Sequence, residues 1–173
     1  MRFARWVALA ALLTAPAAAP AATKAGPATT AALERFKSLA GEWVSATDGP
    51  FFKKGDLVAR YAVTAGGSTV VETVFPGTEH EMVTVYFADG EDLVLTHFCM
   101  AGNQPRMRAK SPTAARVEFA YDGGSNIDAD RDRHMHSAVF EFPGPDALRS
   151  HWTELAAGKV DFVADMDLVR KGK

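Results

Sequence analysis

The chain of 173 residues contains one cysteine, Cys99, so no disulfide can form within it. Its 19 basic and 21 acidic side chains nearly balance, and the formal charge of -2 gives no reason to expect binding to nucleic acid or to an anionic membrane. The sequence has no Gly-rich phosphate loop, no nucleotide motif and no Ser/His/Asp order signature. These absences exclude a disulfide-stapled scaffold and leave nucleotide chemistry and serine hydrolysis without support.

The N-terminus has the pattern of a cleaved secretory signal peptide. A short stretch with two Arg precedes the apolar run 6–13, and an Ala/Pro-rich stretch follows. The apolar run is too short for a stable membrane span. Small residues at Ala17 and Ala21 both fit the signal peptidase pattern, and we expect cleavage after Ala21. The sequence therefore predicts an exported protein, either periplasmic or secreted.

Removal of residues 1–21 leaves 152 residues, which is a common size for one domain. The removed segment carries two Arg and no acidic residue, so the formal charge becomes -4. Residues 22–29 are rich in Ala, Thr, Gly and Pro without periodicity, and they predict a disordered lead-in. We expect residues 30–173 to form a single domain.

Short apolar runs separated by turn residues fill this domain. The clearest signal is the pair of runs 80–87 and 93–100, because the Asp89-Gly90 step between them supplies the positive φ that a tight hairpin needs. No stretch alternates a strand with a long helix, which disfavours a parallel α/β fold. The expected strands are 41–47, 57–64, 68–75, 80–87, 93–100, 104–109, 115–121, 134–142, 147–154 and 160–169.

One short helix is expected before the first strand, with Thr30 as its N-cap and Gly41 as its stop. Leu33 and Phe36 share its apolar side, so the helix should cover an opening in the strands. Consecutive short strands with tight turns predict an all-β fold. The expected architecture is an antiparallel meander β-barrel of about ten strands, in which the helix closes one end.

The first and last strands carry a resemblance. Gly41-Glu42-Trp43 enters the first strand and Leu168-Val169-Arg170 ends the last, and this arrangement is similar to the calycin pattern of lipocalins, fatty-acid-binding proteins and nitrobindin-like barrels. The resemblance implies that Trp43 closes one barrel end under Arg170. The Thr-Asp-Tyr element of typical lipocalins is missing, and two strands more than their eight are expected.

A second resemblance covers most of the domain. The runs FPGTEHEM at 75–82 and THFCMAGNQPRM at 96–107, with HMH at 134–136, resemble an exported bacterial family of lipocalin-like domains that has no assigned activity. This resemblance supports the fold and the compartment and brings no catalytic residue. We therefore expect residues 30–173 to be one lipocalin-like barrel domain.

An inner face that mixes Phe, Met and Leu with few polar groups is typical of a ligand pocket. Our leading hypothesis is a binding module for a small, largely apolar molecule, with no catalytic residue assigned and no cofactor required. In the last strand, Phe162 to Arg170 in steps of two should face inward, with Asp161, Asp165 and Asp167 outward. The expected ligand-binding residues are His97, Cys99, Arg106, His136, Tyr86 and Phe140.

A metal-dependent enzyme is the alternative. His134 and His136 lie two apart in a strand whose even positions continue as Ala138, Phe140 and Phe142, so both imidazoles should face the barrel interior. Together with His97 or Cys99 they could ligate one metal ion. His134-x-His136 followed by Glu141 also resembles half of the first cupin motif, whose other half is missing here. Separately hydrogen-bonded side chains are the simpler interpretation.

Haem is a further alternative, because the nitrobindin-like resemblance implies that one imidazole can serve as an axial ligand. His136 and His97 are the candidates, and covalent attachment is excluded because the chain has no Cys-x-x-Cys-His. The sequence leaves the roles of two polar residues open. Arg106 either orients a ligand carboxylate or carbonyl group or is simply exposed, and Glu72 either faces solvent or pairs with an Arg such as Arg106 or Arg60.

Overall fold

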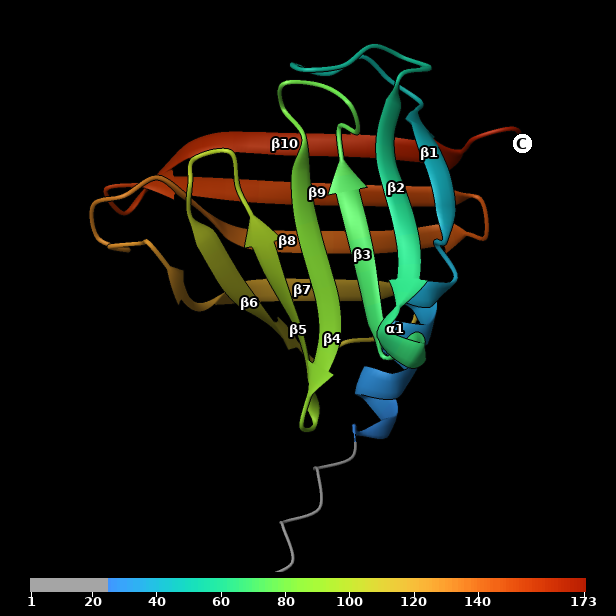
Figure 1. The fold of residues 1–173 in the computed structure, drawn as a ribbon, viewed down its shortest axis with the longest axis horizontal. Helices are drawn as coiled ribbons and strands as arrows, with labels where there is room; N and C mark the ends of the chain where they lie inside the picture. Colours follow the sequence, from blue (N-terminus) through green and yellow to red (C-terminus); the bar gives the residue numbers. More distant parts are fainter. Residues whose placement is uncertain (1–24) are drawn as a thin grey trace, which may run out of the picture.

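The computed structural model describes residues 25–173, so the predicted signal peptide and its cleavage site lie outside the described residues. The described chain forms one α-helix followed by ten strands (Figure 1). None of its helices is long and apolar enough to cross a membrane. The elements are α1 (Pro27–Lys37), β1 (Gly41–Ser45), β2 (Leu57–Thr64), the 3-10 helix η1 (Ala65–Gly67), β3 (Thr69–Val74), β4 (Met82–Asp89), β5 (Asp92–Phe98), β6 (Gln104–Lys110), β7 (Arg116–Ser125), β8 (His134–Gly144), β9 (Ala147–Ala156) and β10 (Lys159–Arg170).

The ten strands form a closed antiparallel barrel. Each strand pairs with its neighbours in sequence, and β1 pairs with β10 to close the ring, with Trp43 opposite Arg170. Figure 1 shows β8, β9 and β10 crossing behind β2, β3 and β4. The predicted all-β meander barrel is thus confirmed, and its architecture is consistent with a calycin-like barrel. Closure leaves no unpaired sheet edge in this ring of strands.

The helix begins earlier than the sequence predicts. Gly26 is the N-cap, and Pro27 occupies the first helical turn, where its missing N–H is no loss. Thr29 is buried, and its hydroxyl donates a hydrogen bond of 2.5 Å to the carbonyl oxygen of Glu91. Residues 27–29, predicted to belong to a disordered lead-in ending before Thr30, are therefore an ordered part of the barrel domain.

The contact predicted between Trp43 and Arg170 is present at the end of the barrel that α1 covers. The guanidinium carbon of Arg170 lies 4.5 Å from the centroid of the buried Trp43 ring, a cation–π distance. The indole N–H donates to the carbonyl oxygen of Leu39 at 2.8 Å. Arg170 also donates to the carbonyl oxygens of Ser38, Ala40 and Pro145 and pairs with Asp146.

Phe36 is the side chain through which α1 fills this end. It is fully buried, and its ring centroid lies 4.3 Å from that of Tyr86, 5.1 Å from that of Phe140 and 5.5 Å from that of Phe142. Leu33, on the same side of the helix, is also buried. The helix thus closes one end as predicted, and the interior remains accessible from the opposite end.

Candidate functional site

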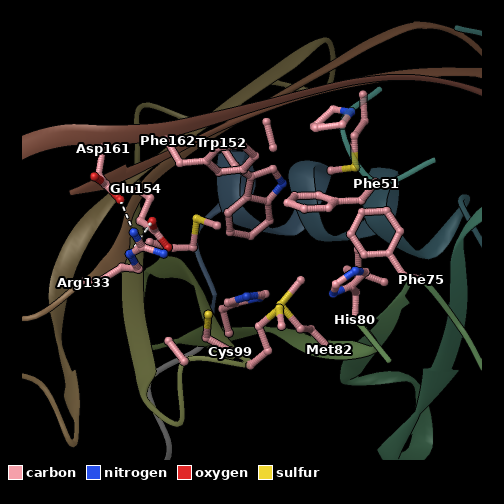
Figure 2. A pocket seen from close by; sticks show the side chains of 18 of the residues that line it. Phe51, Phe75, His80, Met82, Cys99, Arg133, Trp152, Glu154, Asp161 and Phe162 are labelled. Carbon is pink, nitrogen blue, oxygen red and sulfur yellow. Dashed lines mark ion pairs between the residues drawn. The ribbon is translucent and has the colours of Figure 1, made fainter. Parts of the chain in front are cut away.

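A cavity of about 510 Å³ lies at the end of the barrel opposite α1. It is bounded by the loop 50–52 and by the ends of β3, β5 and β9 and the starts of β4, β8 and β10 (Figure 2). Most of its lining is apolar. The apolar residues are Pro50, Phe51, Phe52, Val74, Phe75, Met82, Met100, Ala101, Met135, Trp152, Phe162, Ala164 and Met166.

Aromatic rings form one side of the cavity mouth. The ring of Phe51, which is 50% exposed, lies 5.1 Å from the His80 ring and 5.6 Å from the Phe162 ring, centroid to centroid. Phe75 is buried behind it at 6.3 Å. Figure 2 shows Phe51, Phe75 and His80 together on one side of the cavity. This side offers apolar contact to anything that enters.

His97 places a buried nitrogen without a partner at the cavity. Its Nδ1 lies 2.9 Å from the hydroxyl oxygen of Thr84, whereas its Nε2 is buried and has no hydrogen-bond partner among the described residues. The ring also lies 5.2 Å from the Trp152 ring. Burial lowers the pKa of His97 from 6.5 to about 4, so the imidazole is neutral near pH 7. Such a nitrogen can form a hydrogen bond with a polar group of a ligand.

Charged side chains gather on the other side of the mouth. Arg133 Nε lies 3.2 Å from Glu154 Oε1, and Arg133 Nη2 lies 2.6 Å from Asp161 Oδ2, as the dashed lines in Figure 2 show. The Glu154 side chain is 8% exposed, and its pKa is raised by burial against the opposing effect of Arg133. The guanidinium of Arg133 is therefore already paired with two carboxylates.

Asp161 stands at a β-bulge that interrupts the pairing of β10 between Val160 and Phe162. Asp161, Asp165 and Asp167 are all exposed, as predicted, and at the bulge the Asp161 carboxylate also borders the cavity mouth beside Arg133. A bulge inserts one residue into the alternation, so parity counted from the far end of the strand fails beyond it.

A second bulge, in β8 between Met135 and Ser137, changes where the two histidines lie. Met135 lines the cavity, whereas His134 and His136 do not. Their rings lie beside Tyr121, at 4.7 and 5.3 Å between centroids, and His134 Nε2 is 3.2 Å from His136 Nδ1. The expected inward orientation of this pair, counted without the bulge, is not observed.

The metal-site hypothesis requires the two histidines of β8 to lie close to His97 or Cys99. His97 and Cys99 line the cavity, and His134 and His136 lie outside its lining. Within residues 25–173 no group of three or more His, Cys, Asp or Glu side chains is arranged to hold a metal ion. The geometry therefore gives no support to the metal-dependent enzyme.

The other predicted ligand-binding residues divide between core and surface. Tyr86 and Phe140 are fully buried in the core around Phe36 and do not line the cavity. Arg106 also lies outside the cavity lining, where its guanidinium pairs with Asp89 at 2.5 Å. Of the six residues, the structure brings His97 and Cys99 to the cavity.

Glu72 corrects another expectation. It is buried, and within residues 25–173 it pairs with no Arg; instead Tyr61 and Tyr86 each donate a hydroxyl hydrogen bond to one of its carboxylate oxygens. Burial raises the pKa of this carboxyl above its usual value. Glu72 does not line the cavity, so it is a hydrogen-bonded polar group of the core.

Sequence reasoning missed Trp152 and Glu154, two residues that line the cavity. Both lie on β9, where the even positions Leu148 and Ser150 are buried and the alternation continues to Glu154. This alternation was visible in the sequence and would have placed both side chains inside.

Comparisons of the chain with models of known protein families, with curated proteins and with solved structures found no match.

Proposed function

We propose that this barrel is a binding module for a small, largely apolar ligand held in the cavity at its open end. The observation that carries the proposal is the cavity itself. Its volume of about 510 Å³ falls within the range of small-molecule sites, and its lining is predominantly aromatic and aliphatic with few polar groups. The N-terminal pattern supports a role for the protein outside the cytoplasm.

The lining suggests how such a ligand is held. Apolar atoms leave water and contact Met82, Met166 and the rings of Trp152 and Phe162, which supplies the hydrophobic driving force. One polar group of the ligand meets His97 Nε2, which otherwise stays buried without a hydrogen bond. The resemblance to lipocalin-like and nitrobindin-like barrels supports the same use of the interior.

Titration with N-phenyl-1-naphthylamine, an uncharged fluorescent probe, tests the proposal. Trp152 lines the cavity and is 4% exposed, so a probe bound there should quench its emission by energy transfer. We expect saturable binding of one probe per chain. Native mass spectrometry of protein purified from its own cells should in addition reveal a small molecule retained by part of the population.

A pair of substitutions locates the binding. Ala164→Phe places a ring in the cavity and should abolish probe binding, whereas Ala62→Phe adds the same ring to an exposed position of β2 and should leave it unchanged. Thermal melts establish that both variants are folded. Equal binding by the folded Ala164→Phe variant and wild type, or no saturable binding by wild type, would refute the proposed site.

A further inference from the structure

We propose that the cavity selects uncharged ligands that carry a carbonyl or hydroxyl group and rejects carboxylates and other anions. This inference rests on the proposed function and names the ligand class for the same cavity. Arg133 is the sole Arg or Lys that lines the cavity among residues 25–173, and two carboxylates, Glu154 and Asp161, line it as well.

Arg133 has no free charge to offer an anion. Its guanidinium contacts Glu154 at 3.2 Å and Asp161 at 2.6 Å, so with both carboxyl groups ionised the three side chains sum to one net negative charge. The order of burial strengthens the effect, since the Glu154 side chain is 8% exposed whereas that of Arg133 is 61% exposed. An anion moving inward therefore leaves the cation behind and approaches the more buried carboxylate.

The polar contact offered by His97 suits an uncharged group. The hydroxyl of Thr84 occupies Nδ1 of His97. The buried Nε2 donates to a carbonyl oxygen in the tautomer that carries its proton on Nε2, and it accepts from a hydroxyl group in the tautomer that carries it on Nδ1. A neutral imidazole cannot balance the charge of a buried carboxylate, and a buried charge without a counterion is strongly disfavoured.

His80 is the other histidine of the lining, with its Nε2 3.9 Å from the carboxylate of Glu79 and its Nδ1 buried without a partner. If protonated, it would add a cation to the aromatic side of the mouth. The test is therefore made at pH 8, above the usual titration range of imidazole.

Competition at pH 8 between two molecules of equal chain length provides the test. N-phenyl-1-naphthylamine bound to wild type is displaced with 1-decanol or with decanoate. We expect decanol to displace it at a concentration at least about tenfold lower, because burying the carboxylate is unfavourable. Equal or stronger displacement by decanoate, or no displacement by decanol, overturns the inference. Failure of the probe to bind at all refutes instead the proposed function.

Variants then assign the selectivity to the charged cluster. Glu154→Gln leaves Arg133 paired with Asp161 alone. The concentration of decanoate that displaces the probe should then fall at least about threefold relative to that of decanol. Asp161→Asn, at a more exposed position, should act in the same direction. Asp165→Asn is the matched control, since Asp165 is exposed and pairs with His151 outside the cavity lining. An unchanged decanoate-to-decanol ratio in both cluster variants would contradict the assignment.

Discussion

Buried polar side chains in this barrel are satisfied to different degrees. The indole N–H of Trp43 donates to the carbonyl oxygen of Leu39, and the carboxylate of Glu72 accepts from two tyrosine hydroxyls. His97 is hydrogen-bonded through Nδ1 alone. A buried polar atom without a partner loses the hydrogen bonds that water would supply, so it is the position at which a ligand gains most. His97 and His80, whose Nδ1 is also buried without a partner at the cavity, are therefore the polar residues most directly tied to binding.

The titration of His97 gives a prediction for stability. Its pKa of about 4 in the folded chain lies below the ordinary 6.5, so as pH falls below 6.5 the unfolded chain takes up the proton first. Wild type should lose about 2 kcal/mol of unfolding free energy between pH 7 and pH 5 from this group, and His97→Gln should not. Urea unfolding of both proteins at the two pH values measures the difference.

The comparison with His97→Gln is necessary because Glu72 changes the unfolding free energy with pH in the opposite direction. Its raised pKa makes the folded chain bind the proton more tightly, so its contribution to stability falls as pH rises above the usual carboxyl range. Subtracting the His97→Gln curve from the wild-type curve removes this contribution. Parallel curves for the two proteins between pH 5 and pH 7 would show that His97 is not held neutral.

At the scale of elements, α1, β1 and the end of β10 act as one closing unit. Trp43 is buried under Arg170, and Arg170 in turn holds the backbone that follows α1. Trp43→Ala should lower the unfolding free energy by about 3–5 kcal/mol, because truncating a buried aromatic residue leaves a void. Chemical denaturation measures this loss. Val169→Ala, on the outer face of the same β10 end, should change stability by less than about 0.5 kcal/mol.

The β8 bulge makes a separate prediction about orientation. In a Cys99→Ser background, the Met135→Cys variant should react with N-ethylmaleimide that enters the cavity, and bound N-phenyl-1-naphthylamine should slow this reaction. The His136→Cys variant, whose substituted position lies outside the cavity lining, should react at the same rate with and without the probe. Reaction rates followed by mass spectrometry decide the matter, and protection of position 136 alone would mean that the bulge is misplaced.

For the whole molecule, closure of the ring governs how the barrel opens. Because β1 pairs with β10 through Trp43, Val44 and Ser45, neither strand is an edge. Their amides should exchange with solvent as slowly as those of β4 and β5, and much more slowly than those of the loops 46–56 and 126–133. Hydrogen exchange read by mass spectrometry tests this. Exchange of β1 at the rate of the loops would indicate an open seam.

Fold and cavity differ in how far local sequence predicts them. The turns at Asp89-Gly90 and at Ala157-Gly158, and the alternation between such turns, mark the strands with errors of a few residues. The closed end was also predictable, because Trp43 and Arg170 lie in the first and last strands, which a barrel must pair. The start of α1 was missed because Pro27, a breaker elsewhere, is favoured in a first helical turn.

The sequence by itself thus determined the all-β class and the order of the strands, because these follow from periodicity and turn chemistry along neighbouring residues. The closure by Trp43 and Arg170 was expected from the calycin resemblance. The tertiary structure decided which side chains of β8 face the cavity, and it brought Arg133, Glu154 and Asp161 together at the mouth. The bulge in β8 turns Met135 toward the cavity and leaves His136 outside, and the bulge in β10 lies where Asp161 borders the mouth; a bulge depends on pairing with a partner strand. One residue of added backbone reverses which side chains are inside, and so decides the chemistry of the site.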